Sequence, residues 1–172
     1  MAQVFLGLGS NIERERHITA ALDRLATSFG ELQLSSVYES EAIGFEGDAF
    51  LNLVVRIETS LGVGALSALL KTIEDDNGRC RQGPRFSGRT LDIDILTYGD
   101  LVGVFEGVTL PRDEITHNAF VLQPLAEIAP SELHPQLRQS YAQLWADYDK
   151  SAQRLWPVDF CWRQRQVSRA SV

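Results

Sequence analysis

The feature that most constrains this chain is a seven-residue stretch, from Thr90 to Leu96, in which apolar and acidic residues alternate. A period of two is typical of a β-strand with one face in a hydrophobic core. It predicts that Asp92 and Asp94 point to the same side of the strand, while the isoleucines beside them are buried. Two carboxylates therefore meet on one surface of the folded chain.

Two neighbouring carboxylates repel each other, and each raises the pKa of the other. A divalent cation between them removes this repulsion, and hard oxygen ligands suit Mg²⁺. Four arginines precede the acidic strand, at positions 79, 81, 85 and 89. A guanidinium group binds phosphate oxygens two at a time, so these arginines and a metal ion predict a site for a polyphosphate that is attacked at phosphorus.

The arginine-rich run 78–88 contains one large apolar side chain, Phe86. Such a run cannot build a core of its own, and we expect a loop next to the two carboxylates. The alternative is a solvated network of surface ion pairs without a function. Because the loop adjoins the acidic strand directly, the phosphate site is the favoured interpretation.

The chain of 172 residues fits one domain, and its 44% of apolar residues are enough for a hydrophobic core. Its formal charge of -7 argues against general binding to nucleic acid, which requires a basic face. No apolar run approaches the ~20 residues of a membrane span, and Cys80 and Cys161 form no paired motif. We expect a cytoplasmic protein without nucleic-acid or membrane partners, as a monomer or weak homodimer.

Residues 150–172 form a basic tail, in which five Lys or Arg residues stand against a single acidic residue. The aromatic residues Trp156, Phe160 and Trp162 predict that part of the tail packs on the rest of the chain. The last residues, 168–172, are expected to fray. We therefore expect residues 1–149 to form a single domain that carries the site, followed by a partly packed tail.

The order of the expected elements indicates the fold class. In chain order these are a strand (4–8), a helix (ending at 30), strands (32–38 and 50–58), a helix (66–73), the acidic strand, a hairpin from 99–100 into 101–105, and helices (120–128 and 137–148). This order is typical of an α+β ferredoxin-like sandwich, an antiparallel sheet with helices on one face and three active-site loops. From the residues alone we expect a metal-dependent enzyme that transfers phosphoryl groups or acts on phosphate esters, with its second substrate left open.

Several motifs follow one another in the order of a known family. They are Gly9-Ser10-Asn11, Glu74, Gly78-Arg79-x-Arg81, Gly88-Arg89-Thr90-Leu91-Asp92-Ile93-Asp94-Ile95-Leu96, and Phe120-Val121-Leu122-x-Pro124-Leu125-x-Glu127-Ile128-Ala129-Pro130. Through these motifs the chain resembles the 6-hydroxymethyl-7,8-dihydropterin pyrophosphokinases of folate synthesis, and the resemblance covers residues 3–148. The resemblance implies transfer of the β,γ-diphosphate of ATP to the pterin hydroxymethyl group, with release of AMP.

The resemblance also implies a role for each matching residue near the phosphates. Asp92 and Asp94 match the residues that hold two Mg²⁺ ions in the family. The positions that match family contacts to phosphates are Arg79, Arg81 and Arg89, and those that match contacts to ATP are Glu74, Arg81, Arg89, Ile95 and Thr109. The expected co-substrate is therefore ATP with two Mg²⁺ ions, and the arginines and aspartates are the expected catalytic residues.

A second group of matching residues implies a pterin pocket. Phe50 and Phe120 match the two aromatic residues that sandwich the pterin ring in the family, and Asn52 matches the amide that reads its edge. The remaining matches belong to the loop that contacts the same edge, and they are Ser40, Ile43 and Gly44. The expected second substrate is a reduced hydroxymethyl pterin.

Four positions depart from the family pattern, and they are Phe86, Arg112, Asp113 and Asn118. The family usually has a histidine after the proline of the third loop and an arginine two residues before the stacking phenylalanine, where this chain has Arg112 and Asn118. We hypothesise that Arg112 supplies the missing positive charge as a catalytic residue. The alternatives are a diverged copy that is slow or prefers a related pterin, a module that binds ATP and pterin without turnover, and a metal-dependent nuclease built on the same aspartates.

Overall fold

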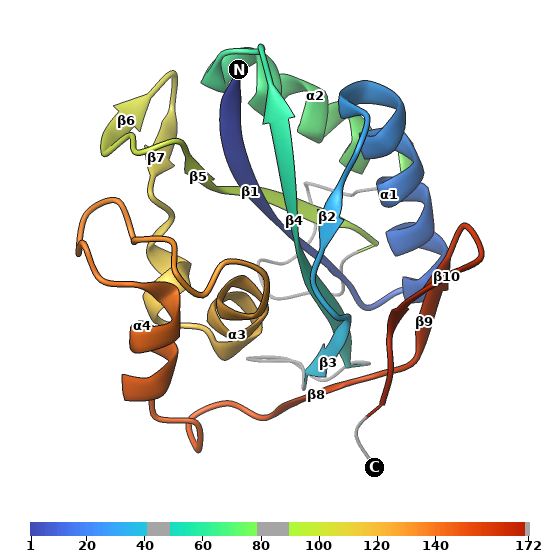
Figure 1. Cartoon of the computed structure of the whole chain (residues 1–172). Coiled ribbons are helices and arrows are strands. Elements are labelled where there is room, and N and C mark those ends of the chain that lie inside the picture. The colour runs from blue at the N-terminus through green and yellow to red at the C-terminus, as the bar shows by residue number, and fades with distance from the viewer. Residues whose placement is uncertain (41–48, 79–89, 171–172) are drawn as a thin grey trace.

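The computed structural model describes residues 1–40, 49–78 and 90–170, and its centre is one antiparallel sheet (Figure 1). The sheet has six strands, in the order β5-β1-β4-β3-β8 with β2 beside β4. Their bounds are β1 Ala2–Ser10, β2 Gln33–Leu34, β3 Tyr38–Ser40, β4 Phe50–Thr59, β5 Asp92–Tyr98 and β8 Leu155–Pro157. Two hairpins form separate two-stranded sheets, one from β6 (Gly103–Phe105) and β7 (Val108–Leu110) and one from β9 (Phe160–Trp162) and β10 (Arg165–Ser168).

Strands β1 and β4 form the spine of the main sheet. They run antiparallel in one register, with Ala2 opposite Thr59 and Ser10 opposite Leu51. Alternate apolar side chains of both strands point to one face, where helices α1 (Arg14–Phe29) and α2 (Val63–Asp76) bury them. The predicted ferredoxin-like antiparallel sheet is confirmed, with α1 and α2 on one face.

The opposite face carries two further helices, α3 (Ala119–Ile128) and α4 (Tyr141–Asp147). Phe5, Val54 and Leu96 point to this face and belong to the cluster that α3 and Tyr141 bury. The prediction of helices on one face holds for α1 and α2, while α3 and α4 add a layer because the sheet has apolar residues on both faces. Among the helices of the described residues, none has the length and apolar character needed to cross a lipid bilayer.

The prediction of one strand over 32–38 is wrong, since this segment forms the two short strands β2 and β3. Between them, Ser35 Oγ accepts a hydrogen bond from Val54 N at 2.9 Å, so a side chain replaces part of the backbone ladder. Ser36 donates its backbone N–H and its hydroxyl to the Glu127 carboxylate of α3, at 3.0 and 2.8 Å. These side-chain bonds compete with strand pairing and divide the strand.

The predicted hairpin turn at Gly99–Asp100 is also wrong. Gly99 donates its N–H to Gln3 O at 2.8 Å, so this turn closes the end of β5 against β1. The hairpin lies further along, where Glu106 and Gly107 connect β6 to β7 with φ angles of 51° and 84°. Positive φ at both turn residues matches the twist of a two-residue hairpin.

The two remaining helices begin at other residues than the sequence predicted. The expected helix over 120–128 is confirmed as α3, and the loop before it contains a short 3-10 helix, η1 (Asp113–Thr116). The helix expected from 137 begins only at Tyr141. The reason is that Ser140 Oγ accepts a hydrogen bond from Gln143 N at 3.1 Å, which caps the helix at this point.

The basic tail packs on the body through β8 and the β9–β10 hairpin. Strand β8 pairs with β3, and Phe160 and Trp162 are buried in the main hydrophobic cluster. The expectation of fraying is wrong for Ser168, which is buried and whose hydroxyl lies 3.3 Å from Val37 O. The domain boundary after residue 149 stays a prediction.

His134 gives the fold a predicted dependence on pH. It is buried, its Nδ1 accepts hydrogen bonds from the backbone N–H groups of Gln136 and Leu137, and burial lowers its pKa. The unfolded chain therefore binds a proton below about pH 6.5 that the folded chain excludes, so we expect the free energy of unfolding to fall by up to about 1.4 kcal/mol per pH unit from there down to the folded pKa. Above about pH 6.5 this group contributes no pH dependence.

Urea unfolding at pH 7.5 and at pH 5.5 measures this effect. The variant His134→Asn keeps an acceptor near the same backbone groups but does not titrate. We expect its free energy of unfolding to change less between the two pH values than that of the wild type. Equal changes in the two proteins would contradict the assignment to His134.

Candidate active site

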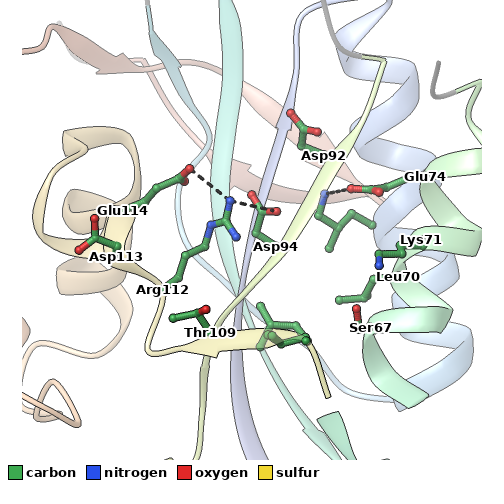
Figure 2. Close-up of a pocket in the computed structure, with 14 residues that line it drawn as sticks. Ser67, Leu70, Lys71, Glu74, Asp92, Asp94, Thr109, Arg112, Asp113 and Glu114 are labelled. Atoms are coloured by element: carbon green, nitrogen blue, oxygen red, sulfur yellow. Dashed lines mark hydrogen bonds and ion pairs between the residues drawn. The ribbon is translucent and has the colours of Figure 1, made fainter. Parts of the chain in front are cut away.

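A cleft of about 630 Å³ opens where α2, β5 and the segment after β7 meet (Figure 2). Its walls contain six residues that the sequence singled out: Glu74, Asp92, Asp94, Ile95, Thr109 and Arg112. The hairpin that carries Thr109 is tied to α2, because Gly64 N donates a hydrogen bond to Glu106 Oε2 at 2.6 Å. The structure therefore brings together the residues expected around ATP. The other predicted residues of the two substrate loops, Arg79, Arg81, Arg89, Ile43 and Gly44, lie outside the described residues.

Asp92 and Asp94 lie on the same face of β5, as the alternation predicted (Figure 2). On the neighbouring strand β1, Gly9 lies opposite Asp92 and Gly7 lies opposite Asp94. Glycine has no side chain, and the Leu96 side chain packs above Gly7, where a Cβ atom would lie 3.3 Å from Leu96 Cδ2. A Cβ atom on Gly9 would lie 3.2 Å from Asn52 Oδ1, so this glycine lets the Asn52 amide pack closely against β1.

The Arg112 side chain points toward Asp94 and Glu114 (Figure 2). Its Nη2 lies 3.7 Å from Asp94 Oδ1 and 3.2 Å from Glu114 Oε1. Burial lowers the pKa of the guanidinium, but the negative charges of Asp94 and Glu114 outweigh this and raise the pKa above its usual value. Its buried Nε has no hydrogen-bond acceptor among the described residues. Arg112 is thus a permanent cation that neutralises Asp94 here.

Glu74, a residue of α2, holds the backbone of the acidic strand β5 by a hydrogen bond. It is 6% exposed, and its Oε2 accepts a hydrogen bond from Ile93 N at 2.8 Å (Figure 2). Ile93 lies between the two aspartates and is buried on the opposite face. The carboxylate therefore holds the backbone from which both aspartates project, in addition to lining the cleft.

This contact predicts a loss of stability in Glu74→Ala. The variant leaves the buried N–H of Ile93 without its acceptor, so we expect the free energy of unfolding to fall by about 1–3 kcal/mol. Glu74→Gln keeps an oxygen at the same distance and should lose about half as much or less. Urea unfolding of the three proteins tests this, and equal losses in both variants would contradict the proposed bond.

The residues expected around the pterin lie on the same face of the sheet, towards β3. Ser40 and Phe50 are opposite each other on β3 and β4, and Tyr38 is opposite Asn52. Asn52 is buried and its Nδ2 donates to Ser40 Oγ at 2.7 Å, which fixes the orientation of the amide. Phe120 lies in the first turn of α3, the helix that packs on this face.

The donor set of the cleft fits a hard divalent cation. Within the described parts of the chain, no three His, Cys, Asp or Glu side chains cluster closely enough to bind a metal by themselves. Mg²⁺ does not need such a cluster, because it keeps several waters and is usually bound by one or two carboxylates plus substrate phosphates. Arg112 is one cation that Asp94 attracts here, and a metal ion at the same carboxylate would serve the same electrostatic purpose.

Sequence reasoning missed two charged residues of the cleft, Lys71 and Glu114. Lys71 lies three residues before Glu74, a spacing that places both on one face of α2, so a signal was present. Glu114 lies in η1 and bonds to Arg112, and no pattern in the sequence indicates that pair.

Comparisons with known proteins indicate the family of this chain. The family model described as 7,8-dihydro-6-hydroxymethylpterin-pyrophosphokinase (HPPK) matches residues 5–130. A protein of Aquifex aeolicus named 2-amino-4-hydroxy-6-hydroxymethyldihydropteridine pyrophosphokinase is 38% identical over 141 residues, which cover 81% of this chain and 88% of that protein. A protein of the same name from Bacillus subtilis is 38% identical over 128 residues, which cover 72% of this chain and 76% of that protein.

Solved structures share the fold at much lower identity. The wild-type HPPK-DHPS of Plasmodium falciparum superposes with a TM-score of 0.71 at 14% identity, over 97% of this chain and 50% of that chain. A crystal structure of an HPPK-DHPS in complex with substrates gives a TM-score of 0.69 at 14% identity, over 88% of this chain and 46% of that chain. This chain thus spans about half the length of those solved proteins. At such low identity the likeness supports the fold and nothing finer.

Proposed function

The chain belongs to the 7,8-dihydro-6-hydroxymethylpterin-pyrophosphokinase family, and we propose that it transfers a diphosphate group from ATP to 6-hydroxymethyl-7,8-dihydropterin. The products are AMP and the pterin diphosphate, in a step of folate biosynthesis. The observation that carries this proposal is a row across the sheet, in which Asp92 lies opposite Gly9 and Gly9 lies opposite Asn52. The row places the acidic pair and the amide that would read the pterin on one face of the sheet, with a glycine between them.

Asp92 and Asp94 are the proposed ligands of two Mg²⁺ ions. When bound, Mg²⁺ neutralises the charge of phosphate oxygens and helps to align them for transfer. The two carboxylates share one face of β5, and Glu74 holds the backbone between them at Ile93 N. Rigid backbone under both ligands supports their proposed role, because small displacements of a reacting group slow a transfer strongly.

In the proposed reaction the hydroxymethyl oxygen of the pterin attacks the β-phosphorus of ATP. The bond from the β-phosphorus to the oxygen that bridges to the α-phosphorus breaks, AMP leaves with that oxygen, and the hydroxyl proton passes to water. Such a transfer requires mainly positioning and charge stabilisation from the protein. We propose that Arg112, a charged guanidinium beside Asp94 here, contacts the phosphates when ATP is bound, while Asp94 would hold Mg²⁺.

The other predicted residues keep their proposed roles. For the phosphates these are Arg79, Arg81 and Arg89, for the nucleotide Glu74, Ile95 and Thr109, and for the pterin Ser40, Ile43, Gly44, Phe50, Asn52 and Phe120. Residues 1–149 are the proposed catalytic unit, in a cytoplasmic protein that is a monomer or weak homodimer.

One observation favours a second candidate, a module that binds ATP and pterin without turnover. Asn118 occupies the place where the family usually has an arginine, and its Oδ1 accepts a hydrogen bond from Gln153 Nε2 at 2.9 Å. It therefore supplies no positive charge to a phosphate. Arg112, which lines the cleft beside Asp94 and brings a positive charge there, supports turnover over this alternative.

Product analysis with ATP, Mg²⁺ and a small panel of reduced pterins tests the proposal. We expect AMP to appear only when a hydroxymethyl pterin and Mg²⁺ are both present, with chelation of Mg²⁺ by EDTA as the control. Release of ADP instead would indicate transfer of a single phosphoryl group. Binding of both ligands without AMP release would favour the module that lacks turnover.

A further inference from the structure

The segment after α4 lies beyond the family match, which ends at residue 130, yet it touches both walls of the proposed pterin pocket. In Figure 1 its orange-to-red trace leaves α4, passes along β3 as β8 and reaches α1 as the β9–β10 hairpin. We name residues 151–157 the strap. Its two contacts with the walls of the pocket are independent of each other.

The first contact is with the beginning of α3. Gln153 Oε1 accepts a hydrogen bond from Ala119 N at 2.8 Å, and its Nε2 donates to Asn118 Oδ1 at 2.9 Å. Asn118 is the N-cap residue of α3, but its side chain makes no capping hydrogen bond. Gln153 therefore supplies from the tail the acceptor that the first N–H of the helix needs. Phe120, the proposed stacking residue, is the next residue along.

The second contact is with β3. Residues 155–157 of the strap, which form β8, pair with this strand so that Leu155 lies opposite Ser40. Ser40 in turn accepts the hydrogen bond that orients Asn52, the proposed reader of the pterin edge. The strap thus supports the polar wall of the pocket from the edge of the sheet.

The far end of the tail is anchored on α1. Trp162 Nε1 and Arg163 Nε both donate to Asp23 Oδ1, at 2.9 and 3.0 Å. Phe160 and Trp162 are buried in the core. The anchor makes the strap a fixed connection between α3 and β3, so that a change at Gln153 alters the pocket without releasing the tail.

We propose that the strap is a positioning element of the pterin pocket, and that Gln153 is the positioning residue that sets the first turn of α3 and with it Phe120. This inference rests on the proposed function. It predicts a specific effect on the pterin, because the residues that line the ATP cleft include neither a residue of the strap nor a hydrogen-bond partner of Gln153. The body of α3 is held separately by its fully buried Leu122 and Leu125 and by Glu127, so the fold survives the loss of one cap.

The test compares Gln153→Ala with Gln143→Ala, a change of the same kind at an exposed position on α4. Isothermal titration calorimetry measures the Kd of the hydroxymethyl dihydropterin in the presence of a non-hydrolysable ATP analogue, and steady-state assays measure KM and kcat. For Gln153→Ala we expect the pterin Kd and KM to rise about 3- to 10-fold, which is the size of effect that the loss of one hydrogen bond produces. The kcat and the KM for ATP should change less than about twofold. Gln143→Ala should match the wild type.

A third variant provides the rescue. Gln153→Glu keeps an oxygen acceptor for Ala119 N and adds negative charge at the helix N-terminus, where it is favourable. Because a carboxylate cannot donate to Asn118 Oδ1, we expect this variant to recover part of the lost pterin affinity. Thermal melting of all variants monitors the fold.

The outcomes of these experiments distinguish the positioning role of Gln153 from the proposed function. An unchanged pterin Kd in Gln153→Ala, or equal losses of pterin and ATP affinity, would overturn the positioning role while leaving the proposed function intact. A wild type that binds the pterin without AMP release would overturn the proposed turnover, whereas the inference would still stand if Gln153→Ala binds the pterin more weakly. A wild type that binds no pterin would overturn both.

Discussion

Replacing Asp94 by asparagine is expected to reduce the rate of AMP release by about a thousandfold or more. The change removes one negative charge from the pair that is proposed to hold Mg²⁺, while the size and shape of the side chain stay nearly the same. Asp92→Asn should have an effect of the same order, because both carboxylates share one face of β5. Quantification of AMP by chromatography under saturating substrates measures the effect.

Asp100→Asn provides the matched control. Asp100 is exposed beyond the other end of β5, away from the cleft, so this variant should keep the wild-type rate. If the rate of Asp94→Asn falls by less than about tenfold while the fold is intact, the loss is smaller than a metal ligand contributes. The metal assignment would then be untenable.

The second large effect is expected for Arg112→Ala. We expect kcat to fall about a hundredfold, because a cation that stabilises charge on the transferred group contributes mostly in the transition state. The Kd of ATP should change less than about threefold, since removal of Arg112 also frees Asp94 from a competing cation. Arg112 pairs with Asp94 and Glu114 in the structure. These two ion pairs are the reason why we expect a large effect on kcat and a small effect on the Kd of ATP.

Two further variants sharpen the test of Arg112. Arg112→Lys keeps the positive charge and should recover part of the rate, although a lysine lacks the planar fork of the guanidinium. Arg165→Ala removes an exposed arginine from the tail and should leave the rate unchanged. A fall in ATP affinity as large as the fall in kcat would show that Arg112 binds the ground state and would contradict the proposed role.

The parts of the fold that the sequence predicted are those that depend on local patterns. The period of two around Asp92 and Asp94 is a property of a single strand, and it survives in the structure because Ile93 and Ile95 are buried on the other face. The helical periods of α1 and α2 are local in the same sense. Glu74, Ile95 and Thr109 followed from motif resemblance, and they line one cleft together with the two aspartates.

The predictions that were wrong concern places where contacts between distant residues determine the local structure. Strand β2 ends early because Ser35 and Ser36 bond to Val54 and to Glu127, two residues far along the chain. The hairpin turn was assigned to Gly99 because glycine with aspartate is a strong local turn signal, whereas Glu106 adopts the positive φ that the observed turn requires.

The tail is the clearest case of non-local structure. Its aromatic residues indicated packing, but pairing of residues 155–157 with residues 38–40 joins strands that lie more than a hundred positions apart. No period or spacing within either segment encodes such a partner. The role of Gln153 at the start of α3 could be found only from the folded chain.

A crystal structure of the protein with Mg²⁺, a non-hydrolysable ATP analogue and the hydroxymethyl dihydropterin tests the central claim most directly. The account predicts two metal ions bound by the carboxylates of Asp92 and Asp94, with the pterin hydroxyl directed at the β-phosphorus and Arg112 in contact with the phosphates. Both ligands bound with no metal ion at either carboxylate would contradict it.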